Sequence, residues 1–425
     1  MGQPQGQSVL TKEGGIMAES VSTETAEAPF MTTRWTGLVE AIRSRAYWLT
    51  ILFLSLIAAA GAAAGVHAKL IGSLEAYGAS REIPWGILIS TYVFFAVTST
   101  GLCIVSAIGH VFGVKVLAPV AKRALFLAVA TILGGFFVIF FEIENPFRMA
   151  IYNVLSPNLT SNIWWMGTLY GAFIVFATVE YYLLLRRKYR YAVMIGFVGV
   201  IVDIAANSNL GAVFGMLGGH EYWYGPFMPI YFIASAMMSG VGAIILFTLS
   251  AYKIRGEKME PAMKRALEVT TRIAILLIAV ILLFTVWNFI TGFAGGEAKI
   301  MALEALLTGP FAFNFWVLEI GIGMIIPLVL FVKSKGTNLG MMALGSAMMM
   351  FGIFFMRYDL VVVGQVVPLQ YDLEVNEYHG LLSYTPSWHE IAVVLGSIAL
   401  VGLFFLLGER AFGGHKVEAH EGGEH

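Results

Sequence analysis

The sequence predicts an all-α membrane protein that crosses the bilayer ten times. Its residues are 58% hydrophobic and only 12% charged, whereas a soluble domain carries roughly 25% charged residues. Ten apolar stretches each approach the ~20 residues that a helix needs to cross the hydrocarbon core. These runs are continuous rather than alternating, which excludes a membrane β-barrel and leaves helices as the spanning structure. The net charge of −1 gives no indication of nucleic-acid binding.

The predicted spans, in chain order, are 47–68, 86–109, 124–142, 164–185, 191–217, 226–251, 271–294, 311–332, 338–356 and 389–408. They define a membrane domain over 46–410, preceded by an arm over 1–45 and followed by a tail over 411–425. The arm begins with polar, acidic residues and lacks the apolar core of a signal peptide, so we expect it to stay uncleaved in the cytoplasm. The tail histidines (His415, His420 and His425) are widely spaced, which favours a solvated tail over a metal site.

Lysine and arginine in the connecting segments predict the orientation. One set of loops carries fifteen of these cations and the other set carries five, namely Lys69, Arg81, Arg148, Lys299 and Arg357. Cytoplasmic loops are the cation-rich ones, so both termini are predicted to lie in the cytoplasm of a bacterium, with the spans in its inner membrane. The opposite loops, 142–163, 295–310 and 357–388, are longer and richer in aromatics and carboxylates, which is typical of a face where a partner docks or a site opens.

An internal repeat relates two halves of the domain. Arg81-Glu-Ile-Pro-Trp-Gly86 aligns with His220-Glu-Tyr-Trp-Tyr-Gly225, and the same offset pairs Tyr92 with Tyr231, Gly101 with Gly240 and Glu180 with Glu319. The offset spans an even number of helices, so both copies run in the same direction. We therefore predict two parallel four-helix bundles, helices 2–5 and 6–9 (repeats about 81–217 and 220–356), flanked by helices 1 and 10.

Polar residues inside the spans are candidates for a proton path. An ionisable side chain at a helix centre costs roughly 2.5–3.5 kcal/mol on insertion scales, so each one needs a reason. Asp203 and Asn207 lie in helix five, Glu180 lies toward the cytoplasmic end of helix four, and Glu319 lies in the outer half of helix eight. The alternative for Asp203 is a structural hydrogen bond to Asn or Ser on a neighbouring helix.

A second group of candidates lies at the outer ends of the helices. His67 ends helix one beside the small-residue run Ala58–Gly65, which lets a flat ligand or another helix approach closely. Glu142 closes helix three on the same face. We expect these two groups to exchange protons with a bound redox ligand, walled by aromatic residues at the same face: Trp85, Trp164, Trp223 and Tyr224. The alternative is that they are ordinary interfacial groups.

The cysteine count limits the redox chemistry of the chain. A lone thiol, Cys103, cannot hold an iron–sulfur cluster or a c-type haem. Any metal redox centre must therefore use histidine or belong to a partner. A b-type haem between His67 and His389 is an alternative, but His389 lies beside Pro386 and Trp388 at a helix start, so we expect no bound metal or haem. The methionines between Met341 and Met356 are interpreted as helix packing.

The sequence resembles the NrfD-type (polysulfide-reductase-like) membrane subunits. The resemblance covers about 45–410 and is carried by the ten helices, the paired bundles, His110-Val-Phe-Gly113 and the Trp223-Tyr-Gly-Pro-Phe227 start of helix six. It points to the ten-helix branch represented by DsrP, QrcD and HybB, and both the DsrP-like and QrcD-like alternatives stay open.

The resemblance implies a subunit without a redox cofactor of its own. Such subunits bind menaquinone or ubiquinone near the outer face and exchange electrons with a ferredoxin-like iron–sulfur subunit docked there. Molybdopterin-type or multihaem cytochrome c subunits are the further partners expected in such a respiratory complex, as found in sulfur metabolism. His67 matches the family's quinone-site histidine by position, although Ala63 stands where the family has an asparagine.

The expected function is thus that of the quinone-reactive subunit of a respiratory oxidoreductase, with proton translocation as a further expectation. A haem-bearing anchor and a secondary transporter are the alternatives. Transporters usually have inverted repeats and helices broken at midplane. Here the predicted repeat is parallel, and Pro226, Pro229 and Pro310 lie at helix starts.

Overall fold

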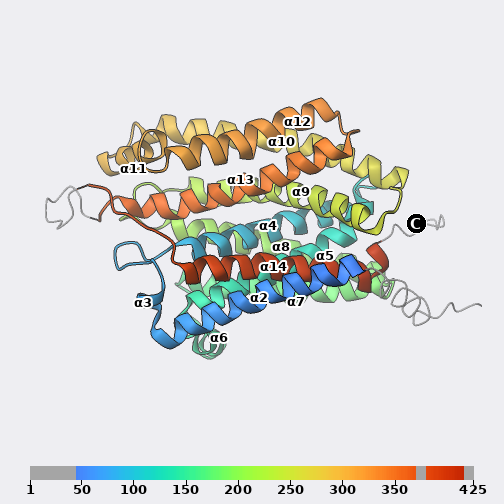
Figure 1. The fold of residues 1–425 in the computed structure, drawn as a ribbon, viewed down its shortest axis with the longest axis horizontal. Coiled ribbons are helices and arrows are strands. Elements are labelled where there is room, and N and C mark those ends of the chain that lie inside the picture. The colour runs from blue at the N-terminus through green and yellow to red at the C-terminus, as the bar shows by residue number, and fades with distance from the viewer. Residues whose placement is uncertain (1–44, 370–379, 416–425) are drawn as a thin grey trace, which may run out of the picture. The chain divides into compact units, whose positions relative to one another are not determined.

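The protein is helical throughout the part of the chain that the structure describes. The structure, a computed structural model, describes residues 45–369 and 380–415, and no strand occurs among them. Ten helices in these ranges are long and apolar enough to cross a membrane. The all-α polytopic fold predicted from the sequence is therefore confirmed (Figure 1).

The ten spans are α2 (Arg45–Ile71), α4 (Ile87–His110), α5 (Ala118–Glu142), α7 (Asn162–Leu185), α8 (Tyr189–Gly215), α9 (Phe227–Arg255), α10 (Pro261–Gly292), η1 (Asn314–Ile325) continued by α12 (Ile326–Ser334), α13 (Leu339–Val366) and α14 (Trp388–Ala411). Short helices connect some of them: α3 (Ser73–Ala76), α6 (Pro146–Leu155) and α11 (Glu297–Leu307). A 3-10 turn, η3 (Gly413–His415), follows α14.

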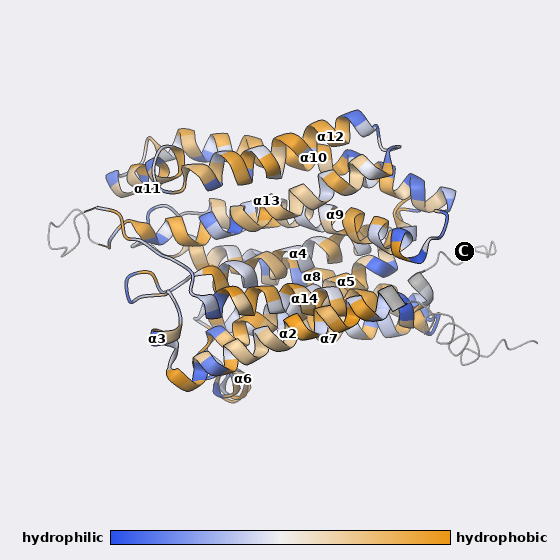
Figure 2. Cartoon of the chain, viewed as in Figure 1, coloured by the Kyte–Doolittle hydropathy of each residue, from blue (hydrophilic) through white to orange (hydrophobic). Residues whose placement is uncertain are grey.

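The two ends of the helix assembly differ in their connections. Helices α3, α6 and α11 all lie in the longer loops of one end, which we call the loop-rich end (Figure 1). The other end has short connections that carry the Lys and Arg residues of the positively charged loops, and we call it the basic end. Hydrophilic residues gather at both ends while the spans between them are apolar (Figure 2).

Several helices extend beyond their predicted bounds. Helix α10 begins at Pro261 rather than 271, and α13 continues to Val366 rather than ending at 356. The prediction that Arg357 lies in a loop is therefore wrong: it is fully buried inside α13. A span predicted from hydropathy ends at the first charged residues. In α13 the helix continues through its charged residues, because they are buried inside the protein.

The helices pack in two groups that meet along α4 and α9. Helix α4 packs on α5 and α8, and α7 packs on α5 and α8. Helix α9 packs on α10 and α13, and α12 packs on the same two helices. These neighbours are the ones that the predicted pair of bundles requires, and they support that grouping, which remains a proposal.

The groups touch through the glycines that the repeat had aligned. A Cβ atom added to Gly101 of α4 would overlap the carbonyl oxygen of Ala236, and one added to Gly240 of α9 would overlap the backbone of Gly101. Gly101 and Gly240 are equivalent residues of the two repeat copies. Equivalent residues touch each other when the twofold axis that relates the two copies passes through their contact. Only glycine allows the two backbones to approach so closely.

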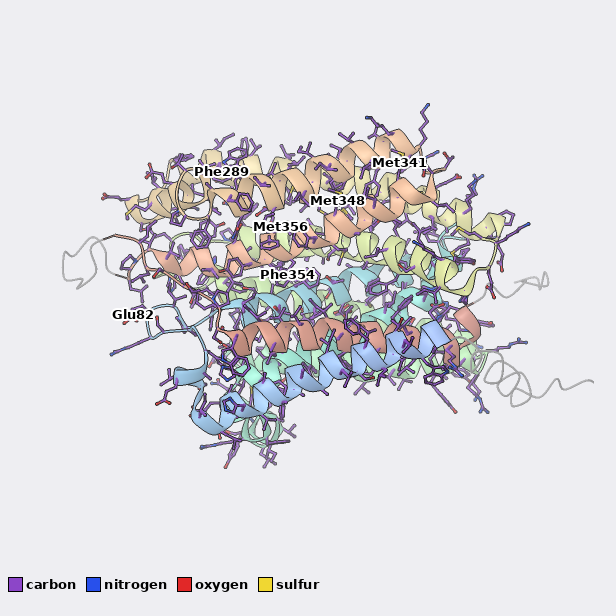
Figure 3. All side chains as sticks on the ribbon, in the orientation of Figure 1. Glu82, Phe289, Met341, Met348, Phe354 and Met356 are labelled. Carbon is purple, nitrogen blue, oxygen red and sulfur yellow. The ribbon has the colours of Figure 1, made fainter. Side chains whose placement is uncertain are left out.

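Helix α14 packs along α2 and against α5, outside the contact between α4 and α9. Gly61 of α2 is also a close-packing residue, since a Cβ there would lie 2.6 Å from the Ala392 carbonyl oxygen of α14. The methionine-rich run lies along α13 (Figure 3), and Met342, Met349 and Met356 are buried. Burial of these three side chains agrees with the interpretation of the run as helix packing.

The eighth span is not a regular α-helix. Its first half, η1, has π-helical hydrogen bonding, and α12 then begins with Pro327 in its first turn. Proline lacks the backbone N–H that a continuous helix would use, so the hydrogen-bond pattern changes at this point. Pro226, Pro229 and Pro310 were noted at helix starts, whereas Pro327 lies inside a membrane span. Because π-helical segments often occur at functional sites, the position of Glu319 on η1 makes it a candidate functional residue.

We predict that Gly101→Ala destabilises the folded protein by about 1–3 kcal/mol or more, as overpacked cores do. The added methyl has no space beside Ala236. Thermal unfolding in detergent measures the effect. Gly171→Ala in α7 is the matched control, because no atom lies within 4 Å of a Cβ there. Equal unfolding temperatures for the two variants would contradict the close contact between α4 and α9.

Candidate functional site

Two histidines from the ends of the outer helices bind each other at the loop-rich end. His67 Nδ1 lies 2.9 Å from His389 Nε2, and the rings are stacked with centroids 5.2 Å apart. His389 Nδ1 faces the Ala76 carbonyl oxygen at 3.2 Å and must donate to it. With both rings neutral, His389 Nε2 is then the acceptor and His67 Nδ1–H the donor, which makes His67 Nε2 the acceptor nitrogen of the pair. Among the described residues nothing binds this nitrogen, and the His67 ring is exposed.

The His389 side of the pair is held by a buried carboxylate. Glu390 accepts hydrogen bonds from the backbone N–H groups of Gly78 (2.7 Å) and Ser387 (2.8 Å) and from the Tyr384 hydroxyl (2.6 Å). Ser387 caps α14 in return, which completes a capping box. Burial, reinforced by the charge of Glu390, raises the pKa of Tyr384, so this phenol stays a donor. The first turn of α14 is thus fixed in position before any ligand arrives.

Glu142 lies beside the histidine pair, at the end of α5. The Lys69 ammonium group of α2 binds the Ile143 carbonyl oxygen, and Gly65 of α2 packs on the Phe141 ring. The charges of Glu390 and Lys69 both act on Glu142. The structure therefore brings His67 and Glu142 to the touching ends of α2 and α5. Together, His67, His389, Glu142, Lys69 and Glu390 are called the histidine cluster.

The predicted aromatic wall is more scattered. Trp85 packs on Trp223 and Phe214, with ring centroids 5.6 and 5.4 Å away. The indole of Trp164 donates to the Asn153 carbonyl oxygen of α6 at 2.7 Å, and Tyr224 is exposed. Among the described residues, no ring contact or hydrogen bond joins Trp85, Trp164 or Tyr224 to His67 or Glu142. A single wall made of all four predicted aromatic residues stays a prediction.

The polar residues of the first group of helices lie in its interior. Asp203 of α8 is fully buried and accepts from the Thr100 hydroxyl of α4 at 2.9 Å, while its other oxygen has no partner. Asn207 is buried with both side-chain polar atoms unsatisfied. Glu180 of α7 is buried against Gly196 and, among the described residues, makes no ion pair. An unpaired buried polar group costs about 1–3 kcal/mol, so these three residues are not explained by stability.

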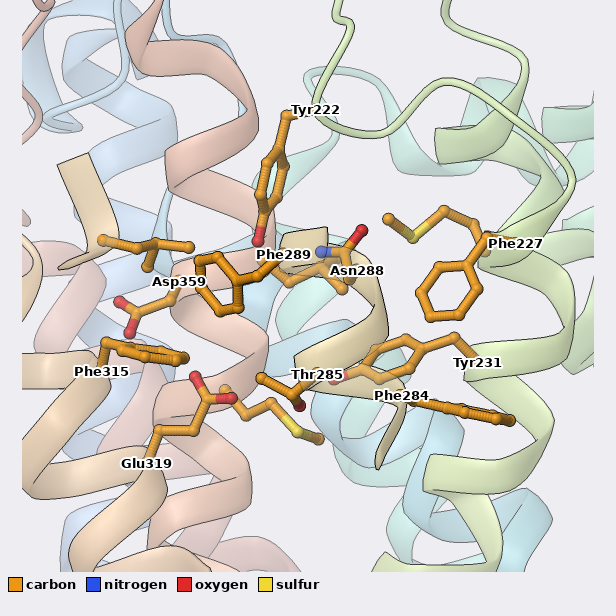
Figure 4. A pocket seen from close by; sticks show the side chains of 14 residues that line it. Tyr222, Phe227, Tyr231, Phe284, Thr285, Asn288, Phe289, Phe315, Glu319 and Asp359 are labelled. Carbon is orange, nitrogen blue, oxygen red and sulfur yellow. The ribbon is translucent and has the colours of Figure 1, made fainter. Parts of the chain in front are cut away.

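The second group of helices contains a cavity of ≈ 40 Å³ near the loop-rich end. Six of its 14 lining residues are aromatic, and Figure 4 shows two carboxylates, Glu319 of η1 and Asp359 of α13, facing into it. Asn314 donates to one oxygen of Asp359 at 3.2 Å, whereas the other oxygen is buried without a partner. We call this space the acid cavity.

Arg357 lies in α13 beside the acid cavity, toward α9. Its Nη2 donates to the Ser235 hydroxyl of α9 at 2.6 Å, and the guanidinium lies 5.1 Å from the Phe232 ring centroid. Its Nε and Nη1 are buried without hydrogen-bond partners. Sequence reasoning missed Arg357 and Asp359 as site residues because both were assigned to a loop. The signal for a continued helix was the apolar run Leu360–Val363 that follows them.

The basic end contains a cluster of paired charges. Glu409 of α14 accepts from Arg123 of α5 at 2.6 and 3.1 Å, from Arg255 of α9 at 2.7 Å and from His415 at 3.0 Å. His415 Nε2 accepts in turn from the Tyr181 hydroxyl at 2.8 Å. Burial lowers the pKa of His415. The prediction of a solvated His415 is therefore wrong, because it is a buried partner of Glu409, whereas His420 and His425 lie outside the described residues.

The fold agrees with the comparison with known proteins. The sequence matches the family described as "Polysulphide reductase, NrfD" over residues 75–369, and the protein belongs to this family. The predicted family resemblance is confirmed.

Three relatives show how broad the family is. The protein is 26% identical, over 84% of its length and 92% of the relative's, to the "Hdr-like menaquinol oxidoreductase integral membrane subunit" of Archaeoglobus fulgidus. It is 24% identical to the C component of selenate reductase from Mesobacillus selenatarsenatis, over 83% of its length and 91% of the relative's. It is also 24% identical to the C component of polysulfide reductase from Wolinella succinogenes, over 70% and 98% respectively. Membrane subunits of oxidoreductase complexes are the shared class.

The paired cluster at the basic end leads to a stability prediction. Glu409→Gln leaves Arg123 buried without its counter-charge, so we expect a loss of about 3–5 kcal/mol. Glu257→Gln removes a half-exposed partner of Arg255 and should cost at most about 1 kcal/mol. Chemical unfolding in detergent compares the two variants. A Glu409→Gln protein as stable as Glu257→Gln would mean that Arg123 is not stabilised by this pair.

Proposed function

We propose that this protein is the quinone-reactive membrane subunit of a multisubunit respiratory oxidoreductase. It would exchange electrons between the menaquinone or ubiquinone pool and an iron–sulfur partner on the periplasmic face. Family membership and the relatives described as menaquinol oxidoreductase and polysulfide reductase subunits support this class. The observation that carries the proposal is the His67–His389 pair, which presents one unprotonated imidazole nitrogen at the loop-rich end.

The histidine cluster has the groups that quinone chemistry needs. Oxidation of a quinol releases two electrons and two protons, and each proton needs an acceptor within hydrogen-bond reach. His67 Nε2 would accept the proton of one hydroxyl, and the Glu142 carboxylate, beside Lys69, would accept the other. The electrons would leave for the iron–sulfur partner. In the reverse direction the same groups donate their protons to the two carbonyl oxygens.

The loop-rich end is the proposed docking face for the partner. It carries α3, α6 and α11, and every side chain of α6 is at least partly exposed. The basic end, with the cation-rich loops, would then face the cytoplasm of a bacterium, as the positive-inside rule predicts. Electron exchange at the loop-rich end would thus take place at the periplasmic face of the inner membrane.

A proton path from the basic end would couple this reaction to the membrane potential. Glu180 lies toward the basic end of α7, Asp203 lies deeper in α8, and Asn207 lies one helical turn beyond. The charges of both carboxylates act on Cys103 of α4. Chains of carboxylates of this kind mark proton relays in membrane proteins. Glu319 is the predicted member of the path in the second group of helices.

A secondary transporter remains the second candidate, because the eighth span changes from π to α geometry at Pro327 beside a buried carboxylate. Broken helices at a ligand site are typical of transporters. Co-purification with iron–sulfur or haem proteins favours the redox subunit, and a protein that purifies alone and moves a solute favours the transporter.

We predict that His67→Ala lowers quinol oxidation by the purified complex by about 10²–10⁴-fold, as loss of a positioned proton acceptor does. Glu142→Gln should act in the same direction. His110→Ala is the matched control, because His110 ends α4 at the basic end. The measurement is the steady-state rate with a short-chain menaquinol. Unchanged rates in His67→Ala would remove the histidine cluster from the reaction.

We predict that Asp203→Asn and Glu180→Gln each abolish charge translocation while quinone chemistry continues. Each substitution keeps the shape of the side chain but removes the group that carries the proton. Complexes in proteoliposomes, followed with a voltage-sensitive dye during turnover, provide the measurement. If both variants build the wild-type membrane potential, protons do not pass through these carboxylates.

A further inference from the structure

The acid cavity holds an unbalanced set of charges. Glu319 and Asp359 face it as two carboxyl groups, and Arg357 is the nearby cation. The charges of Asp359 and Arg357 both act on Glu319. Two ionised carboxylates beside one guanidinium would leave a net negative charge in a buried, apolar region, which is strongly unfavourable. One proton shared by the two carboxyl groups makes the set neutral.

The set is not an ordinary structural ion pair. Among the described residues, Arg357 forms no ion pair with either carboxylate, and both its Nε and its Nη1 lack partners. Asp359 likewise keeps one oxygen without a partner while lining the cavity. In the paired cluster at the basic end, by contrast, both oxygens of Glu409 bind cations, although Nε and Nη2 of its partner Arg255 lack hydrogen-bond partners. Groups left unsatisfied around a cavity are suited to bind and release something small.

A second cavity, of ≈ 120 Å³, lies next to the acid cavity at the loop-rich end. It is lined by His220, Glu221 and the start of the loop after α13, and it shares Tyr222 with the acid cavity. Figure 4 shows the Tyr222 ring extending from above toward the acid cavity, with Asp359 beyond its hydroxyl. Burial raises the pKa of Tyr222 and lowers that of His220. Tyr222 therefore stays a neutral donor, and His220 is a neutral acceptor at the outer side.

We infer that Glu319 and Asp359 bind one exchangeable proton between them, and that the two cavities joined at Tyr222 form its route to the loop-rich surface. The titratable or charged groups that face this proton site are Asp359 and Arg357 on α13, Tyr231 on α9 and Tyr222 in the loop before α9. Helix α10 contributes only neutral polar groups, Thr285 and Asn288. The step is proton binding and release alone, with no electron transferred and no covalent bond formed to carbon.

Arg357 links this site to the first group of helices. Besides its hydrogen bond to Ser235 of α9, its charge acts on Tyr170 of α7, which is also under the influence of Asp203. A positive charge that arrives near Asp203 would therefore raise the potential around Arg357 and weaken proton binding at Glu319. This coupling rests on the proposed quinone reaction and its proton path, whereas the existence of the proton site does not.

A carbodiimide test addresses the proton site directly. Dicyclohexylcarbodiimide reacts with protonated carboxyl groups in apolar surroundings, and mass spectrometry of the full-length protein in detergent locates the adduct. Within η1 and α13 we expect one adduct per molecule, on Glu319 or Asp359, and adducts on the other buried acids, Asp203 and Glu180, are distinguished by their position in the sequence. In Glu319→Gln and in Asp359→Asn the remaining carboxylate balances Arg357 without a proton, so labelling of the remaining acid should fall at least tenfold. Glu304→Gln, at an exposed position of α11, should label like the wild type.

Two outcomes would overturn the inference. One is no adduct on η1 or α13 at any pH at which the protein stays folded, and the other is undiminished labelling of Asp359 in Glu319→Gln.

Infrared spectroscopy gives a second readout: a protonated-carboxyl band of the wild type should vanish in both single variants. Its hydrogen–deuterium exchange should slow in Ala298→Phe, which fills the second cavity, but not in Glu297→Phe, an exposed neighbour. None of these measurements needs quinone or a partner, so they fail or succeed independently of the proposed function.

Discussion

The contact between Gly101 and Gly240 is the constraint on which the rest of the interior depends. In a bilayer the hydrophobic effect does not drive helices together, so close packing and polar contacts must hold them. Here the backbones of α4 and α9 touch, and the polar residues next to the contact are thereby positioned. Thr100, which binds Asp203, precedes Gly101, and Ser235, which binds Arg357, precedes Ala236 at the same contact. Both buried acid sites are therefore built on one helix crossing.

The buried charges separate into structural and functional groups by how fully they are satisfied. Glu409 is surrounded by two arginines and a histidine, and it joins α14 to α5 and α9. Asp203 accepts from a hydroxyl on one oxygen while its other oxygen is unsatisfied, and among the described residues Glu319 forms no ion pair, although the charges of Asp359 and Arg357 act on it. A charge that is buried for stability is paired, because an unpaired one costs several kcal/mol. Incomplete satisfaction is what a group needs if its protonation state is to change.

The sequence predicted the parts of this fold that depend on hydropathy and missed those that depend on burial of charge. The ten spans follow from apolar length, and the aligned glycines of the repeat marked the contact between α4 and α9. Helix α13 was predicted too short because Arg357 and Asp359 look like loop residues until α9 and η1 are seen to cover them. The π-helical turn of the eighth span has no reliable sequence signal, although Pro327 marked where it ends. The sequence placed His67 and His389 at the same face only as the ligands of a haem alternative, and it did not predict that the two histidines bind each other.

The same electrostatic reasoning explains why residue 357 is an arginine and not a lysine. A buried lysine shifts its pKa readily and can give up its proton, whereas a guanidinium stays charged in protein interiors. With a permanent charge at this place, the protonation of Glu319 and Asp359 is the variable that adjusts to keep the region neutral. A lysine could give up its own proton, and both acids would then have to be protonated to keep the region neutral. The guanidinium also reaches Ser235 across the helix crossing, so the fixed charge is anchored to α9, the helix that touches the Asp203 half of the protein.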